Sequence, residues 1–169
     1  MGSLGRALQA HPDALRRLVD DPAVAVIGTL RAAVLETLRR EILTGPVLSG
    51  NKPLVDYLHA AMAHRLNESA RVLHLNTRNL LIRDEQVAEG SIDQAPIYVR
   101  EVARRALELG SAAVILVHNH PSGDPTPSRQ DRALTRELVL ALKPLGISLH
   151  DHLIIGASGH MSFRAAGLL

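Results

Sequence analysis

The tract from His118 to Asp131 carries the residues whose types and spacing can do chemistry. Two histidines stand two residues apart, His118 and His120, and are followed by Ser128 and Asp131, which stand three apart. Side chains two apart on an extended backbone share one face, so both imidazoles can reach the same point. Two His and one Asp form a three-ligand metal set that leaves a fourth position open to water, as in catalytic zinc sites.

A strand and a helix must position these residues. Residues 112–117 are an aliphatic run that predicts a buried strand leading into His118. Thr126 and Pro127 predict a helix start, with Thr126 at the N-cap and Pro127 in the first turn. Ser128 and Asp131 then lie on one helix face. A surface His or an Asp at the positive end of a helix is common by itself, but the joint spacing favours a metal site.

The loop between the ligands, residues 121–127, contains three prolines and a Ser-Gly-Asp turn sequence. We expect it to be rigid and to hold the strand and helix ligands in one geometry. Asp124 is expected to be a turn residue rather than a further ligand, and Asn119 to anchor the loop. In the predicted strand at 147–155, alternation places His150 and His152 on one face and Leu149 and Leu153 on the other. We expect structural or supporting roles for these two histidines.

The spacing His-x-His, seven residues, Ser, two residues, Asp resembles the JAMM (MPN+) metalloprotease motif. The stretches 118–127 (HNHPSGDPTP), 100–110 (REVARRALELG), 151–156 (DHLIIG) and 162–164 (SFR) are similar to the RadC family, over about residues 46–169. The resemblance implies an α/β fold of the MPN/JAMM type, a mixed sheet flanked by helices with cytidine-deaminase-like layering. It also implies one zinc ion per chain held by His118, His120 and Asp131, a catalytic Glu from an earlier strand, and Ser128 assisting at the oxyanion.

The catalytic Glu is assigned from this resemblance, because spacing alone does not determine so distant a partner. Glu68 is favoured, since it stands just before a strand-like stretch at residues 70–75 that would open the catalytic domain. Glu85, after a short strand-like run at 80–82, is the alternative base, and Glu89 is a further competitor. Glu101 and Glu108 lie in a periodic, glycine-capped segment at 99–109 and are expected to face solvent.

These residues predict hydrolysis of a peptide, isopeptide or small amide. A metal at the site would lower the pKa of water towards about 7, and Glu68 would accept the water proton and pass it to the leaving amine. Mixed N and O ligands do not exclude manganese or iron. The alternative is a DNA-repair-associated accessory protein whose metal is structural. A structural site needs neither a base nor an oxyanion donor, so Glu68 and Ser128 favour the hydrolase.

Composition limits the class of protein. A chain of 169 residues can bury one sizeable core with a small appendage. It has no Cys, which excludes disulfides and thiolate ligands and fits a reducing cytoplasm. It has no apolar run of about 18 residues and no signal peptide, so we expect a soluble cytoplasmic protein without membrane contact.

The chain divides into a small N-terminal helical segment, 1–45, and the metal-binding domain, 46–169. Pro12 opens a first helix, and an apolar stripe predicts a second, formed by Ile27, Leu30, Val34, Leu38 and Ile42. Residues 47–53 are a predicted linker, and a helix beginning near Leu54 precedes Glu68. The helix after the ligand loop has a predicted stripe of Leu134, Leu138 and Ala141 and ends near Gly146.

RadC proteins often carry a helix-hairpin-helix unit, whose glycine-rich turn can hold DNA phosphates. The corresponding stretch, residues 18–28, has acids where that turn wants glycines, and the amino end is shorter than the family pattern. Residues 1–45 hold six Arg against five Asp or Glu, whereas a duplex-binding module has a basic patch. We therefore expect a degenerate unit that does not bind DNA and acts as a brace or as the interface of a homodimer.

Overall fold

A computed structural model describes residues 7, 8, 10, 12–47, 52–90 and 97–169. One five-stranded sheet has the order β2-β1-β3-β4-β5, in which β3 and β4 are parallel and the other neighbours antiparallel. The strands are β1 (Ser69–Leu75), β2 (Leu81–Glu89), β3 (Ala113–Asn119), β4 (Ser148–Gly156) and β5 (Gly159–Ser162). The predicted α/β class, with a mixed sheet flanked by helices, is confirmed.

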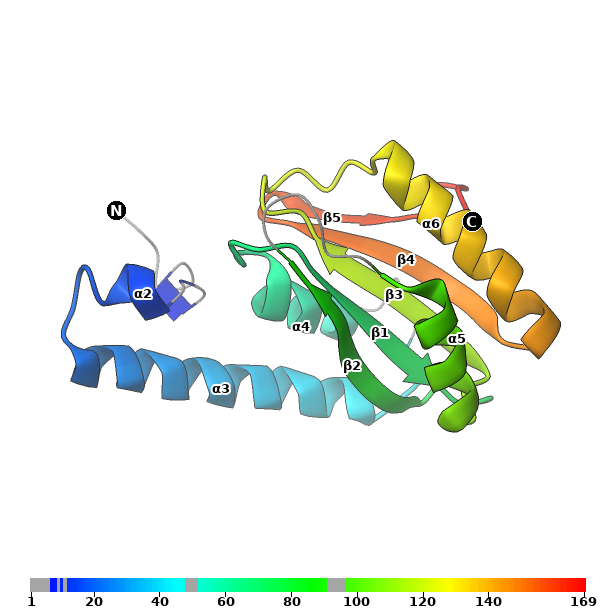
Figure 1. The fold of residues 1–169 in the computed structure, drawn as a ribbon. Coiled ribbons are helices and arrows are strands. Elements are labelled where there is room, and N and C mark those ends of the chain that lie inside the picture. Colours follow the sequence, from blue (N-terminus) through cyan, green and yellow to red (C-terminus); the bar gives the residue numbers. More distant parts are fainter. Residues whose placement is uncertain (1–6, 9, 11, 48–51, 91–96) are drawn as a thin grey trace.

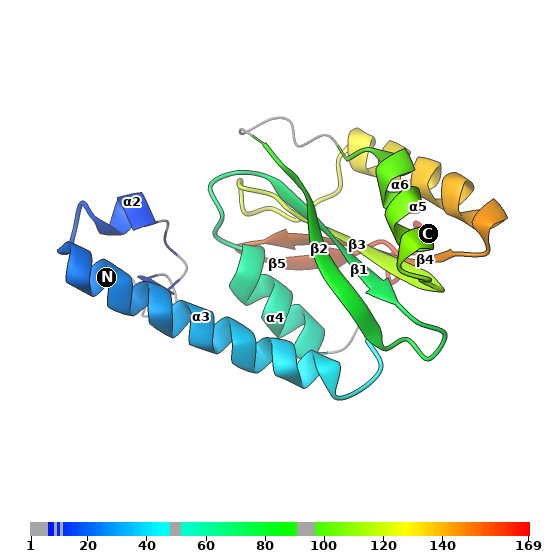
Figure 2. The same cartoon turned by 60° about the horizontal axis from the view of Figure 1, so that its bottom comes forward.

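Helices cover both faces of this sheet. They are α2 (Pro12–Leu15), α3 (Asp21–Leu43), α4 (Lys52–Met62), α5 (Val99–Glu108) and α6 (Arg129–Leu142). Figures 1 and 2 show α5 and α6 on one face, and α4 with the end of α3 on the other. The central strand β3 is therefore buried at all seven positions, as its aliphatic run predicted. The helix α6 lies in the connection between the two parallel strands, and it follows β3 after the loop at residues 120–128.

The long helix α3 extends past the sheet, with α2 folded against its far end (Figure 1). Its predicted stripe is only partly correct. Ile42 is buried and Leu38 packs on the same core, but Leu30 and Val34 are 50% and 43% exposed. The reason is tertiary, because this part of the helix lies beyond the edge of the sheet. No helix among the described residues is both long enough and apolar enough to traverse a membrane.

The predicted linker at 47–53 is shorter in the structure. Residues 48–51 lie outside the described residues, and Lys52 and Pro53 already form the first turn of α4, a position where Pro is well tolerated. Val47 is buried, and its backbone N–H donates to the carbonyl of Asn79 at 2.7 Å. The strand β2 is longer than the run at 80–82 that predicted it.

A bulge in β4 changes the predicted alternation. The pairing with β3 skips His150, which lies between Leu149 and Asp151. Such a bulge shifts which residues face each side of the sheet, so Leu149 packs on the α5–α6 side. The prediction that His150 and His152 share a face is therefore wrong. His150 Nε2 lies 2.7 Å from Asn79 Oδ1, whereas His152 is fully buried.

Candidate metal centre

The start of α6 is set by Ser128, not by Thr126 as predicted. Ser128 is the N-cap: its Oγ accepts from the Asp131 backbone N–H at 3.1 Å, and the Asp131 carboxylate accepts from the Ser128 N–H at 2.7 Å. This reciprocal pair is a capping box. The Thr126 hydroxyl instead donates to Asp124 Oδ1 at 2.7 Å. Asp124 is thus the turn residue that was predicted, and it holds Thr126 outside the helix.

The structure brings His118, His120 and Asp131 together. His118 Nε2 lies 3.0 Å from His120 Nε2 and 3.1 Å from Asp131 Oδ1, and His120 Nε2 lies 3.6 Å from Asp131 Oδ2. Among the described residues, these three form the one group of three or more His, Cys, Asp or Glu side chains that can hold a metal ion. His118 and Asp131 are buried, while His120 is partly exposed. The cluster is therefore open to solvent on the His120 side.

The donor atoms of this cluster fit a divalent cation. His120 Nδ1 lies 2.8 Å from the carbonyl oxygen of Asp124, which can only accept, so in the neutral ring Nδ1 carries the proton and Nε2 a lone pair. If both imidazoles present Nε2 lone pairs, these nitrogens and the Asp131 carboxylate, 3.0–3.6 Å apart, repel one another unless a cation lies between them. Two nitrogens and one carboxylate oxygen are ligands that zinc accepts.

The charge balance of the cluster also favours a cation. Burial alone would raise the pKa of Asp131, but its close contacts with the His118 and His120 side chains hold that pKa well below its usual range. The hydrogen bond to Asp131 raises the pKa of His120 against the effect of burial. A proton can therefore occupy the site when metal is absent, and protons compete with metal for the His120 nitrogen.

The ligand loop rests closely on the β4–β5 hairpin. A Cβ atom at Gly156 would lie 2.3 Å from the carbonyl oxygen of Gly123, so only glycine fits there. That oxygen accepts from the Ser158 N–H at 3.2 Å and from its hydroxyl at 2.8 Å. The backbone N–H of His120 donates to the carbonyl of Ile155 at 2.9 Å. The hairpin thus supports the loop that carries the second histidine.

Glu68 lies directly before β1, the strand that pairs with the one carrying His118. The antiparallel register pairs Ala70 with His118, so the same register continued by two residues sets Glu68 opposite His120. The Glu68 carboxylate contributes to the raised pKa of His120. Within the described part of the chain, no hydrogen bond or ion pair engages this carboxylate, which leaves it available to move a proton.

The alternative base, Glu85, is engaged elsewhere. Arg105 on α5 donates to its two carboxylate oxygens, with Nη2–Oε1 at 2.6 Å and Nε–Oε2 at 2.8 Å. The hydrogen bonds from Arg105 lower the pKa of Glu85, which makes it a poor proton acceptor. Glu101 and Glu108 are exposed on α5, as predicted. Glu89 is exposed and accepts from the side chain of Gln86.

Asn119 anchors the start of β1 rather than the ligand loop. Its Oδ1 accepts from the Ser69 N–H at 2.9 Å and from the Ser69 hydroxyl at 2.8 Å, and its Nδ2 donates to the Asn67 carbonyl at 3.1 Å. Its amide therefore fixes the residues on both sides of Glu68. The alternation of β3 indicated that Asn119 points away from the histidines, but it did not reveal this partner.

Behind His118 lie two further polar side chains. His118 Nδ1 is 2.8 Å from His152 Nε2, and His152 Nδ1 is 2.7 Å from Thr135 Oγ1. Burial lowers the pKa of His152 well below its usual value, so this ring is neutral. The sequence indicated a supporting role for His152, but Thr135 was missed. Its signal was its position four residues after Asp131, which places both on one helix face.

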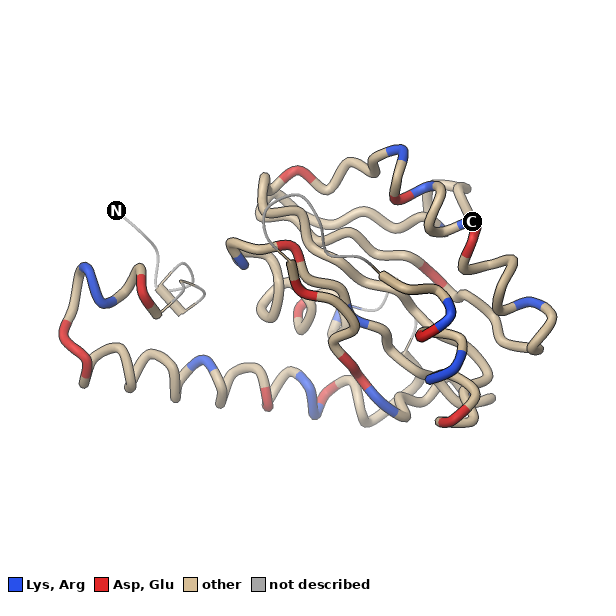
Figure 3. The backbone as a smooth tube through the Cα atoms, in the orientation of Figure 1, with Lys and Arg blue, Asp and Glu red and all other residues tan. Residues whose placement is uncertain are grey.

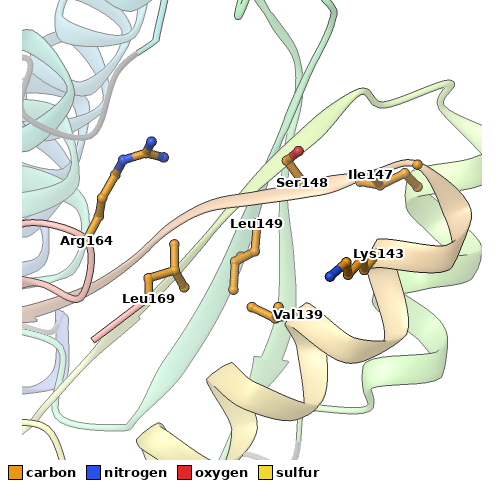
Figure 4. Close-up of a pocket in the computed structure, with 8 residues that line it drawn as sticks. Val139, Lys143, Ile147, Ser148, Leu149, Arg164 and Leu169 are labelled. Atoms are coloured by element: carbon orange, nitrogen blue, oxygen red, sulfur yellow. The ribbon is translucent and has the colours of Figure 1, made fainter. Parts of the chain in front are cut away.

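A pocket of about 510 Å³ lies far from this chemistry. It is lined by residues near the C-terminal end of α6, by β4 and by Leu169 (Figure 4). Val139 and Lys143 line it, whereas Asp131 lies at the opposite end of the same helix. The pocket is therefore not the place where a substrate would meet the His–Asp cluster.

The RadC-like JAB domain family matches residues 48–168. The chain belongs to this family. Relatives that match 99% of the chain are UPF0758 proteins of Rhodobacter capsulatus, 50% identical over 79% of that protein, and of Ruegeria pomeroyi, 45% identical over 76% of that protein. These names state no activity. The sequence resemblance to the RadC family is thus confirmed. The structure separately contains the predicted His–His–Asp cluster, which can hold a metal ion.

Proposed function

We propose that this RadC-family chain is a zinc-dependent hydrolase of peptide, isopeptide or small amide bonds that works in the cytoplasm. The observation that carries the proposal is the convergence of His118, His120 and Asp131 at 3.0–3.6 Å, with the charge of Glu68 close enough to help raise the pKa of His120. The absence of cysteine fits a reducing compartment.

The residues of the chain divide the work of hydrolysis. When bound, zinc supplies Lewis-acid polarisation of the carbonyl and lowers the pKa of water towards about 7. Glu68 takes a proton from the attacking water and delivers it to the nitrogen of the leaving amine. His118, buried at the end of β3, and Asp131, at the start of α6, define the position of the reaction.

Ser128 is the proposed donor to the developing oxyanion. In this structure its hydroxyl donates to Asp131 Oδ2 at 2.6 Å, so it must turn towards the substrate to act in this way. One oxyanion donor contributes about 3–4 kcal/mol. The capping box retains the Ser128 N–H as a second donor to Asp131, so the carboxylate stays held when the hydroxyl turns.

The charges of the N-terminal helices favour the hydrolase over the DNA-associated alternative. Basic and acidic residues are interspersed along α2 and α3 (Figure 3), with pairs such as Arg16–Asp13 and Arg40–Glu36. Duplex binding relies on many unneutralised cations facing phosphate. A brace or a homodimer interface stays our prediction for this segment.

The metal can be tested first. Purified protein supplied with zinc should contain about one zinc per chain by mass spectrometric metal analysis, as for a site with three protein ligands. His118→Ala should lose nearly all of it. Zinc content that is unchanged in His118→Ala would remove the basis of the proposal.

The hydrolysis is tested with Glu68→Gln and a matched control, Glu89→Gln, on the neighbouring strand. Wild type and both variants are supplied with zinc and incubated either with a proteome-derived peptide pool or with peptides joined by lysine isopeptide bonds. Newly formed amino groups are then identified by mass spectrometry. Wild type and Glu89→Gln should cleave, whereas Glu68→Gln should keep its zinc and lose cleavage. Full activity in Glu68→Gln would show that another group is the base.

A further inference from the structure

A chain of buried hydrogen bonds runs from the first histidine of the cluster to the backbone of α6. It passes from His118 Nδ1 to His152 Nε2 at 2.8 Å, and from His152 Nδ1 to Thr135 Oγ1 at 2.7 Å. It ends where Thr135 Oγ1 donates to the carbonyl oxygen of Asp131 at 2.6 Å. His118, His152 and Thr135 are at most 2% exposed, so water does not compete for these bonds.

The last acceptor determines the direction of every bond in this chain. A backbone carbonyl can only accept, so the single hydroxyl proton of Thr135 is donated to Asp131. The Thr135 oxygen must then accept, and the neutral His152 carries its proton on Nδ1. His152 Nε2 has a lone pair in consequence, and it accepts the proton of His118 Nδ1.

We propose that Thr135 and His152 are positioning residues that hold His118 in the tautomer whose Nε2 lone pair faces the cluster. This inference rests on the proposed metal-dependent function, because it is the metal that requires the lone pair. His120 reaches the same state by a shorter route, since its Nδ1 is 2.8 Å from the carbonyl of Asp124.

The position of His152 is itself fixed by the C-terminal residues. Phe163 stacks on its ring at 4.6 Å between centroids and 18° between planes, and the Phe163 N–H donates to the His152 carbonyl at 3.0 Å. Asp151 accepts from the backbone N–H of Arg164 at 2.9 Å and from the hydroxyl of Ser162. The Asp-His pair of β4 and the Ser-Phe-Arg stretch thus form one support for the His152 ring.

Without the hydrogen bonds through His152 and Thr135, the tautomer of His118 would change. Asp131 Oδ1 lies 3.1 Å from His118 Nε2 and would accept a proton from it. An acceptor at Nδ1 is needed to hold the proton on the far side of the ring. Loss of that acceptor moves the proton to Nε2, where zinc must displace it.

The zinc affinity of Thr135 variants tests the inference. Thr135→Val keeps the shape and removes the hydroxyl, and it should weaken zinc binding about 10–100-fold in competition with a chromophoric chelator. Thr135→Ser keeps the hydroxyl and should bind as wild type does. Thr37→Val on α3 removes an equivalent bond to a carbonyl four residues earlier, at 2.9 Å, and should leave affinity unchanged. Equal affinity in Thr135→Val and Thr135→Ser would overturn the inference.

A second readout does not depend on metal. Nitrogen-15 NMR of the ring nitrogens in the zinc-free protein reports which nitrogen of His118 carries the proton. We expect Nδ1–H in wild type and Thr135→Ser, and Nε2–H in Thr135→Val and in His152→Phe, which preserves an aromatic ring against Phe163. Nε2–H in the wild type would refute the positioning role. Failure of wild type to bind zinc would refute the proposed function instead, and the NMR result would still decide the tautomer.

Discussion

Gly156→Ala should disturb the metal centre without touching a ligand. The added Cβ would lie 2.3 Å from the Gly123 carbonyl oxygen and 2.8 Å from its carbonyl carbon. The first distance is more than an ångström shorter than the 3.4 Å of ordinary contact. Both opposing atoms are backbone, so the ligand loop has to move as a unit. His120 would move with it, because its Nδ1 is hydrogen-bonded to the carbonyl oxygen of Asp124 in this loop.

The size of the effect follows from this overlap. Overpacking in a well-packed region costs about 1–3 kcal/mol, which for a chain of this length lowers Tm by about 2–12 °C. Metal sites tolerate shifts of about 0.2 Å in ligand distance. A loop displaced by more than this should weaken zinc binding by at least about tenfold.

The assay pairs thermal unfolding with zinc competition, and Gly28→Ala is the control. Gly28 is exposed within α3, and a Cβ added there would meet nothing within 4 Å. Alanine should stabilise this helix by about 1 kcal/mol, raising Tm by about 2–4 °C, with unchanged zinc affinity. Wild-type Tm and affinity in Gly156→Ala would refute the close seating of the loop on the hairpin.

Three further predictions concern other parts of the chain. Asn119→Ala should keep its zinc but lose about 10–100-fold in peptide cleavage, because Glu68 loses its anchored position; wild-type cleavage would contradict this. Glu85→Gln should lower the free energy of unfolding at pH 7 by about 1 kcal/mol. Since Arg105 lowers the pKa of folded Glu85, its stabilisation is present above about pH 4.3 and is lost as the pH falls through the folded pKa. Urea titrations should therefore show the deficit shrinking at pH 3, while an exposed control, Glu101→Gln, shows little deficit at either pH. Finally, the full chain should not bind duplex DNA at low salt in a fluorescence anisotropy titration; tight binding that falls steeply with added salt would revive the DNA-associated alternative.

The buried strand of the site could be predicted from sequence because its signal is local. The aliphatic run at 112–117 is long enough, and β-branched enough, to predict β3 and the place where it ends. Two histidines at the strand end and an Asp in the first turn of the next helix then follow from spacing. The predicted N-cap, Thr126, was wrong because Thr126 and Ser128 are both residue types that can cap a helix. Asp131 forms the capping box with Ser128, whereas Asp124 accepts a hydrogen bond from the Thr126 hydroxyl. Which of the two hydroxyl residues becomes the N-cap therefore depends on side-chain geometry.

Other features depend on tertiary context that spacing cannot report. The bulge at His150 reverses the alternation of β4, yet nothing in the residues around it marks the extra position. Leu30 has the spacing of a buried helix position and is exposed because the sheet ends before it. The contact of Asn119 with Ser69 joins residues fifty positions apart, a distance over which no periodic pattern extends.

Asp131, in the first turn of α6, is both part of the helix cap and a proposed metal ligand. Asp131 uses Oδ2 for the capping box and presents Oδ1 to His118, so one carboxylate serves both on separate oxygens. Its own carbonyl is the last acceptor of the chain that begins at His118 Nδ1. Both His118 and Asp131 are therefore fixed by hydrogen bonds that do not involve a metal. If the cluster binds a cation as proposed, the fold orders its ligands beforehand, and binding energy need not be spent on ordering them.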